Sequence, residues 1–145
     1  MPKNKHNKTV GSKVERSDDR IKQTGEVFTP MELCYKMVDD IDHKVMQSPE
    51  STFLDNSAGS GNFLAALLDR LVNKFEHDKQ HVLDNMLYCI EFMDDNHTEI
   101  CERLEVPKDH PHYICGDGLD QGIYTRWERE QPEPTEFKEG GGTLF

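Results

Sequence analysis

A turn built of small residues constrains this sequence more than any other feature. A short apolar run over residues 52–55 leads into Asn56-Ser57-Ala58-Gly59-Ser60-Gly61, after which apolar residues recur at helical spacing. These are Phe63, Leu64, Leu67, Leu68, Leu71, Val72 and Phe75. The two glycines let the chain turn tightly and let a ligand lie against bare backbone at a helix N-terminus. The segment therefore predicts a strand, a ligand-binding turn and a helix.

Two further apolar runs have the length and composition of buried strands. They cover residues 87–91 and 113–115. Between them, over residues 94–104, apolar residues recur at helical spacing. Strands that alternate with helices favour a parallel sheet with helices on both faces. We therefore predict an α/β fold with a doubly wound sheet.

The first helix of the domain is expected from Pro30 to about Gln47. Thr29 and Glu32 have the spacing of a capping box around Pro30 at the first helical position. Apolar side chains then recur every four residues, as expected for one buried stripe. They are Leu33, Met37, Ile41 and Val45.

Charge divides the 145-residue chain into three parts. Residues 1–22 carry seven basic and three acidic groups without apolar periodicity, which predicts a disordered basic arm. Residues 23–120 are the expected folded domain, and residues 121–145 are an expected acidic, flexible tail. The net charge of the whole chain is -11, so the acidic body is a poor non-specific partner for nucleic acid.

An acidic residue stands at the end of each expected strand: Asp55, Glu91 and Asp117. In a parallel sheet these ends lie at one edge, where ligands bind. The turn lacks the last small residue of a dinucleotide fingerprint, because Leu64 occupies that position, and no phosphate-loop Gly-Lys pair follows it. A ligand with an adenosine and no phosphate fits these features. S-adenosylmethionine is such a ligand: its amino-acid end suits the glycine turn, and its sulfonium cation tolerates an acidic body.

Four segments in order resemble the motifs of DNA adenine-N6 methyltransferases of the restriction-modification type. They are Thr24-Gly25-Glu26-Val27-Phe28-Thr29-Pro30, Leu54-Asp55-Asn56-Ser57-Ala58-Gly59-Ser60-Gly61-Asn62-Phe63-Leu64, Tyr88-Cys89-Ile90-Glu91-Phe92 and Ile114-Cys115-Gly116-Asp117. The resemblance covers about residues 23–120. It implies a Rossmann-like fold that binds S-adenosylmethionine and is incomplete in this chain, because three strands are expected where the family has about six or seven.

The resemblance also implies a role for each matching position. Phe28 and Thr29 would hold the methionine end of the cofactor, and Glu91 would accept hydrogen bonds from the ribose. Phe92 would flank the adenine, and Asp117 would bind its amino group. The cofactor loop would be formed by Asp55, Ala58, Gly59 and Gly61. Asn56 departs from the family, which has proline there, and we expect a looser turn.

The catalytic motif of that family, Asn- or Asp-Pro-Pro-aromatic, is missing. The sequence has seven prolines and no two are adjacent. No catalytic residue is therefore assigned, and this chain alone is expected to be inactive. It would need a complementing catalytic or specificity chain and would reach DNA through that partner or the basic arm. The alternative is a non-catalytic interaction module that binds or inhibits a DNA-modifying or replication complex.

The cysteines and histidines predict neither disulfides nor a metal site. Cys34, Cys89, Cys101 and Cys115 are scattered, which is typical of free thiols in a reducing compartment. His77 and His81 lie four apart without an evident third ligand, so no metal is expected there. No apolar run approaches the roughly 18–20 residues of a membrane span, and no leader opens the chain. A cytoplasmic protein is expected.

Overall fold

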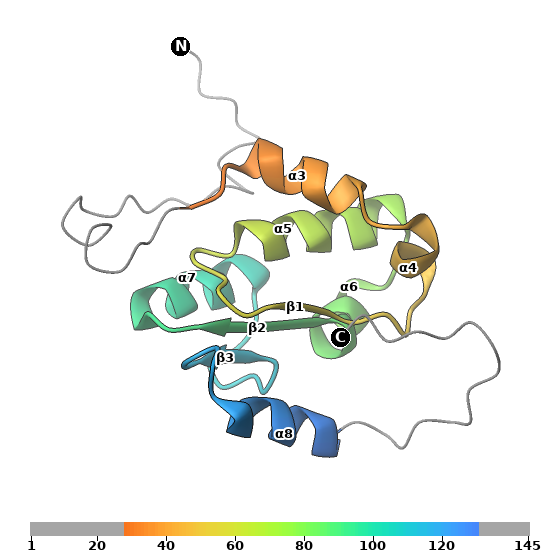
Figure 1. Cartoon of the computed structure of the whole chain (residues 1–145). Coiled ribbons are helices and arrows are strands. Elements are labelled where there is room, and N and C mark those ends of the chain that lie inside the picture. Colours follow the sequence, from red (N-terminus) through yellow and green to blue (C-terminus); the bar gives the residue numbers. More distant parts are fainter. Residues whose placement is uncertain (1–27, 131–145) are drawn as a thin grey trace, which may run out of the picture.

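The centre of the molecule is a small parallel sheet. The computed structural model describes residues 28–130, and its three strands are β1 (Phe53–Asp55), β2 (Leu87–Glu91) and β3 (Tyr113–Cys115), in the order β1-β2-β3 (Figure 1). Leu54 pairs with Tyr88, and Ile90 pairs with Ile114. The prediction of an α/β fold with three parallel strands is confirmed.

The central strand β2 is buried on both faces. Cys89 belongs to the larger hydrophobic cluster, which includes residues of α5 (Asn62–Asp69) and α7 (Asp94–Leu104). Tyr88 and Ile90 belong to a second cluster on the other face. Because side chains alternate along a strand, a strand covered by helices on both sides is apolar throughout. The expectation of helices on both faces of the sheet is confirmed.

The helix expected from Pro30 to about Gln47 is two helices. They are α3 (Met31–Asp39) and α4 (His43–Gln47), and Asp42 caps α4 by accepting a hydrogen bond from the Lys44 backbone N–H at 2.7 Å. The expected capping box around Thr29 is also wrong. Pro30 is the N-cap residue and no side chain caps α3. The Thr29 carbonyl instead accepts a hydrogen bond from Asn62 Nδ2 at 2.8 Å.

The expected helix after the small-residue turn is present, and a second helical segment follows it. Helix α5 continues into the π-helical segment η1 (Arg70–Lys74). Two further elements were not predicted: α6 (Lys79–His81) and the π-helical segment η2 (Val82–Met86). The apolar side chains of η2 are buried. The predicted helix over residues 94–104 is confirmed as α7, although Met93 is its N-cap and no side chain caps it.

The domain extends beyond the predicted boundary at Asp120. Residues 121–130, which were assigned to a flexible tail, form helix α8 (Gln121–Glu130) on the opposite side of the sheet from α3 and α5 (Figure 1). Ile123 and Trp127, one turn apart, are buried in the second cluster with Tyr88 and Ile90. The prediction failed because two large apolar side chains suffice to dock a helix whose other positions are polar.

The remaining parts of the expected organisation lie outside the described residues. These are the basic arm at 1–22, the first residues of the predicted domain and its first motif at 23–27, and the part of the acidic tail beyond residue 130. Within residues 28–130, the longest helices are too short or too polar to traverse a lipid bilayer.

Candidate functional site

Two glycines of the turn after β1 have a backbone conformation that glycine adopts more readily than other residues. Gly59 has a φ of +56° and Gly61 a φ of +89°, both in the left-handed region. The Gly61 backbone also lies against α7: a Cβ atom on this residue would come within 2.9 Å of Ile100 Cγ1. The turn is thus fixed by backbone geometry and by contact with a neighbouring helix.

Two residues that the sequence analysis did not assign hold this turn in place. Arg103 Nη1 donates hydrogen bonds to the Ser60 carbonyl at 2.6 Å and to Asn62 Oδ1 at 3.0 Å. Asn62 Nδ2 in turn donates to the Thr29 carbonyl. Asn62 immediately follows the glycine turn, which is a usable signal in the sequence, whereas Arg103 is 43 residues away from Ser60 and only the fold brings them together.

A hollow of about 120 Å³ lies beside the glycine turn. Its lining includes predicted site residues from two separate segments of the chain: Phe28, Thr29, Asp55, Ala58 and Gly59. The Phe28 ring lies close to the turn, since a Cβ atom on Gly59 would come within 3.1 Å of Phe28 Cδ1. Gly61 lines neither this hollow nor the next one, so its position supports a conformational role.

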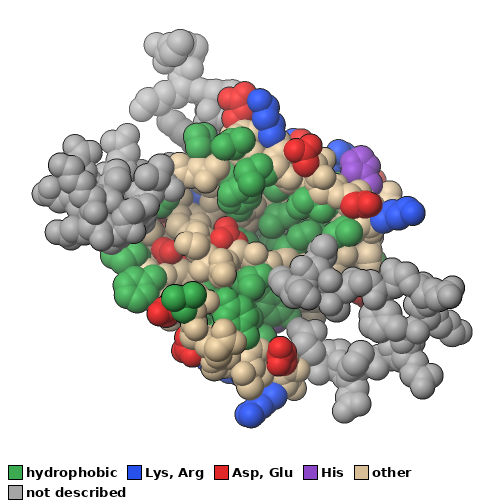
Figure 2. Space-filling view, viewed as in Figure 1, with side chains coloured by type: hydrophobic (Ala, Val, Ile, Leu, Met, Phe, Trp, Pro, Cys, Tyr) green, Lys and Arg blue, Asp and Glu red, His purple; other side chains and the backbone are tan. Residues whose placement is uncertain are grey.

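A second hollow of about 390 Å³ adjoins the first along the same edge of the sheet. Its lining includes Glu91, Phe92 and Asp117, and Ser57 lines both hollows. Phe92 is 71% exposed and Leu119, on the same hollow, is 84% exposed. In Figure 2, acidic side chains stand beside exposed hydrophobic ones at the left, where the strands end in Figure 1. A ligand with both an apolar ring and polar groups would match this edge.

The three predicted acids differ in their surroundings. Burial raises the pKa of the Asp55 carboxyl above its usual value, although the Ser57 backbone N–H, 3.1 Å from Oδ1, opposes this effect. Glu91 is 7% exposed and accepts a hydrogen bond from Asn96 Nδ2 at 3.0 Å. Asp117 is exposed and accepts one from the Leu119 backbone N–H at 2.9 Å.

The Asp55 environment is the strongest electrostatic sign of a ligand site. A desolvated carboxylate is costly unless a positive or hydrogen-bonding group satisfies it. Perturbed carboxyls at the mouth of a hollow are typical of functional sites. A cationic amino group placed in the smaller hollow would supply the missing interaction.

The loops after β1 and β3 touch where the larger hollow begins. A Cβ atom on Gly118 would lie 2.6 Å from the Asn56 carbonyl oxygen, so only glycine fits there without movement of the backbone. Gly118 was not among the predicted site residues. Asn56, the position that departs from the family pattern, therefore contacts the loop after β3 through its backbone carbonyl.

The histidines set aside in the sequence analysis bind backbone carbonyls. Nε2 of His77 lies 2.6 Å from the Met46 carbonyl oxygen, and Nε2 of His81 lies 2.7 Å from that of Pro49. The four cysteines are unpaired, as their spacing predicts. A separate group with the composition of a metal site, Asp94, His97 and Cys115, lies where α7 begins and β3 ends.

Comparison with known proteins supports a relationship to methylases over part of the chain. No protein-family model matches the sequence. A protein of Mycoplasma pneumoniae described as an uncharacterized adenine-specific methylase is 35% identical over 75 aligned residues. The match covers 45% of this chain but 18% of the relative. The chain thus corresponds to less than a fifth of that protein.

Proposed function

We propose that this chain is the S-adenosylmethionine-binding part of a DNA adenine-N6 methyltransferase of the restriction-modification type, with a Rossmann-like fold. The observation that carries the proposal is the arrangement of Asp55, Glu91 and Asp117. The ends of three adjacent parallel strands bring these acids to two adjoining hollows beside a glycine turn. The partial similarity to an adenine-specific methylase agrees with this reading.

The smaller hollow would receive the methionine end of the cofactor. Phe28 and Thr29 line it from one segment of the chain, and Ala58 and Gly59 line it from the glycine turn. Asp55 would accept a hydrogen bond from the cofactor's ammonium group or from a water bound to it. This contact would stabilise the ionised form of a carboxyl that burial otherwise disfavours.

The larger hollow would receive the adenosine. Glu91 would accept hydrogen bonds from the ribose hydroxyls, with its orientation fixed by Asn96. Phe92 and Leu119 would contact the adenine, and Asp117 would accept from its amino group. When bound, the cofactor supplies an electrophilic methyl group on a sulfonium cation.

We assign none of the 145 residues to holding the target adenine, which accepts the methyl group. No Pro-Pro-aromatic motif occurs in the sequence. In this proposal a complementing catalytic segment holds the adenine, which such enzymes take out of the base stack. DNA would be bound by that partner or by the basic residues of 1–22, since the rest of the chain is acidic.

Calorimetric titration of the purified chain with S-adenosylmethionine tests the site. We expect saturable binding that is lost in an Asp55→Ala, Glu91→Ala double variant. A Glu102→Ala, Asp109→Ala double variant changes the net charge equally at two exposed positions away from the hollows and should bind as the parent does. Absence of binding by the parent, or equal binding by both variants, would contradict the site.

A methyl-transfer assay tests whether this chain binds the cofactor while a partner chain supplies the catalytic segment. The chain alone, with S-adenosylmethionine and adenine-containing duplex DNA, should transfer no methyl groups. Addition of the partner that co-purifies from the native host should restore transfer, and the Asp55→Ala, Glu91→Ala variant should not support it. Methyl transfer by the purified chain alone would overturn the claim that the catalytic segment lies elsewhere.

A further inference from the structure

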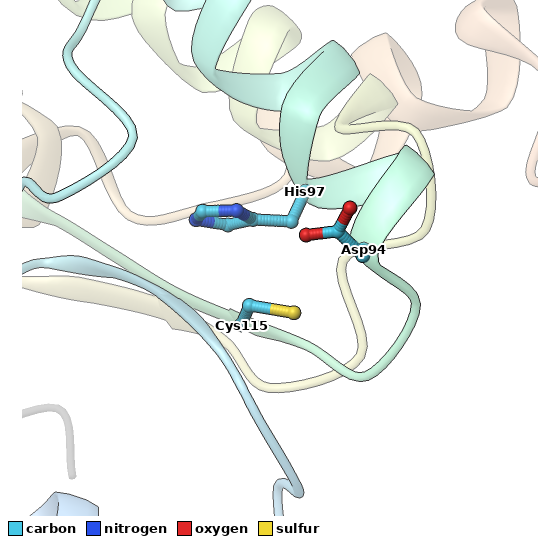
Figure 3. Close-up of side chains that lie close together, drawn as sticks. All are labelled: Asp94, His97 and Cys115. Atoms are coloured by element: carbon cyan, nitrogen blue, oxygen red, sulfur yellow. The ribbon is translucent and has the colours of Figure 1, made fainter.

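Three potential metal ligands converge where α7 begins and β3 ends. Asp94 and His97 are three residues apart in the first turn of α7 and therefore share a face of the helix. Cys115 is the last residue of β3 and lies opposite them (Figure 3). One carboxylate oxygen, one imidazole nitrogen and the thiol sulfur all lie within 4.8 Å of one another.

The hydrogen bonding of His97 leaves one ring nitrogen available as a ligand. Nε2 lies 2.7 Å from the Tyr113 carbonyl oxygen, which can only accept, so the Nε2 atom carries the hydrogen. In the neutral ring, Nδ1 then holds a lone pair. This atom is buried and has no hydrogen-bond partner among residues 28–130, and the whole residue is 3% exposed. A buried acceptor without a donor is unfavourable unless a ligand satisfies it.

We propose that Asp94, His97 and Cys115 form a binding site for a divalent transition-metal ion of the zinc class. Thiolate sulfur, imidazole nitrogen and carboxylate oxygen are the ligands of zinc in proteins, with bonds of about 2.0–2.3 Å. In a tetrahedral site the same bond lengths place two ligand atoms about 3.3–3.6 Å apart. The ligand atoms here lie within 4.8 Å of one another, so metal binding requires the exposed side chains of Asp94 and Cys115 to move inward by about 1 Å.

The second interaction of His97 has the form expected for a metal ligand. A histidine that binds a metal through one nitrogen commonly donates the other N–H to a backbone carbonyl, which fixes the ring. The Tyr113 carbonyl fills that position. On metal binding, the Cys115 thiol would lose its proton to solvent and coordinate as the thiolate.

The charges around the site act in opposite directions. The carboxylates of Asp94 and Glu91 lie close enough to act on the Cys115 sulfur and favour a bound cation. Lys108 Nζ, 3.5 Å from Asp94 Oδ1, and the positive end of α7 oppose it. Lys108 and Asp94 have side chains that are 53% and 80% exposed, so this ion pair is weak and a metal ion can displace it.

The location points to a structural ion that links the start of α7 to the end of β3. Cys115 Sγ lies 3.9 Å from the Phe92 carbonyl oxygen, and Asp117 follows two residues later. A metal here would join the first turn of α7 to the end of β3, next to the larger hollow. The metal proposal does not depend on the proposed cofactor, because its ligands are separate from the lining of either hollow.

Titration of the untagged, metal-free chain with Zn²⁺ in competition with a chromophoric chelator tests the proposal. We expect one ion per chain, and Co²⁺ should give the near-ultraviolet charge-transfer absorption of a cobalt thiolate. Cys115→Ser and Asp94→Asn should each weaken Zn²⁺ binding about tenfold or more, because even outer-shell changes have effects of that size. Both positions are exposed, so circular dichroism should show that the variants fold.

Two matched variants serve as controls. Asp95→Asn alters the neighbouring exposed carboxylate, and Cys101→Ala removes the thiol 3.6 Å from the other His97 nitrogen, Nε2. Both should bind Zn²⁺ as the parent does, and Lys108→Ala should bind it more tightly. The proposal is overturned by absence of binding, by binding that survives Cys115→Ser, or by a cobalt thiolate band that disappears in Cys101→Ala.

Discussion

Arg103 holds the Ser60 carbonyl with a hydrogen bond of 2.6 Å between Nη1 and the oxygen. Ser60 belongs to the glycine turn and Arg103 to the last turn of α7, so this contact joins the proposed cofactor loop to a helix that follows the next strand. Hydrogen bonds from charged donors are stronger than neutral ones. The shape of the turn therefore depends on a residue that touches neither hollow.

Arg103→Ala should weaken S-adenosylmethionine binding without removing any residue of the hollows. Two hydrogen bonds are lost, to the Ser60 carbonyl and to Asn62 Oδ1. Each contributes about 1.5–3 kcal/mol to the free energy of unfolding, and the freed turn must be ordered again when the cofactor binds. Calorimetry and urea unfolding measure the two effects. Arg126→Ala, at an exposed position of α8, is the matched control. Cofactor affinity equal to that of the parent would show that Arg103 does not position the turn.

Asp55→Asn should stabilise the free chain at neutral pH and weaken cofactor binding about tenfold or more, the value of one lost hydrogen bond to a charged group. Burial raises the folded-state pKa of Asp55, so the folded protein binds the proton more tightly than the unfolded one. The ionised carboxylate therefore lowers stability at pH values above the folded pKa, and this loss is absent below about 3.9, the unfolded pKa. Asparagine keeps an oxygen for the Ser57 N–H.

Urea unfolding across this pH range, with calorimetry at neutral pH, tests the Asp55 expectation. The stability difference between variant and parent should shrink as the pH falls through the folded pKa. A variant that is less stable than the parent at neutral pH would contradict the assignment of Asp55 as a ligand-binding carboxylate whose ionised form is disfavoured by burial.

Trp127→Ala should destabilise the domain by about 3–5 kcal/mol, as large core truncations do. The Trp127 ring packs edge-on against Tyr88 at 5.0 Å between centroids, and Nε1 donates to the Pro111 carbonyl at 2.8 Å. Circular dichroism in urea should follow the unfolding, because Trp127 is the only tryptophan and its fluorescence is lost. Thr125→Ala, on the exposed side of α8, should change the midpoint little. An unchanged Trp127→Ala midpoint would mean that α8 is dispensable.

Stability should fall as the pH drops below about 6.5, the ordinary pKa of histidine, because His112 is held neutral. Burial lowers the pKa of His112, and His110 adds to this effect, while the Leu87 carbonyl and the carboxylates of Asp84 and Glu130 oppose it. The unfolded chain then binds more protons than the folded one between the two pKa values, so acid favours unfolding there.

His112→Phe tests this pH dependence. Phenylalanine keeps a ring against Tyr88, where the present rings stack at 3.9 Å between centroids, and it cannot titrate. Urea midpoints measured on both sides of about pH 6.5 should differ less in the variant than in the parent. An identical pH dependence would place the responsible group elsewhere.

The sequence predicted the sheet because its signals are local. The strands ending at Asp55, Glu91 and Cys115 are continuous apolar runs, and the glycine turn marks the start of α5. It also led to the site, since acids at strand ends must share one edge of a parallel sheet. The cofactor roles of these residues remain predictions.

What the sequence did not predict depends on distant contacts. Arg103 and Gly118 acquire their roles only from the Ser60 and Asn56 carbonyls, which lie far away in the chain. Helix α8 was missed because Trp127 lies among charged residues in the sequence and is buried only once the fold brings it to Tyr88 and Ile90 in the second cluster. The break between α3 and α4 follows from the Asp42 cap, which a continuous apolar stripe conceals.

The placement of α8 also determines on which side the sheet can grow. Helices α5 and α7 connect β1 to β2 and β2 to β3, and both contribute to the hydrophobic cluster on one face of the sheet. Helix α8 covers the opposite face. Crossovers between parallel strands are right-handed, so a parallel strand entered from α8 would add beside β1 rather than β3. Within residues 28–130 the outer edge of β1 is unpaired. A complementing partner would then add a strand at that edge. It would raise the melting temperature of this chain and also supply the methyl transfer that the chain alone lacks.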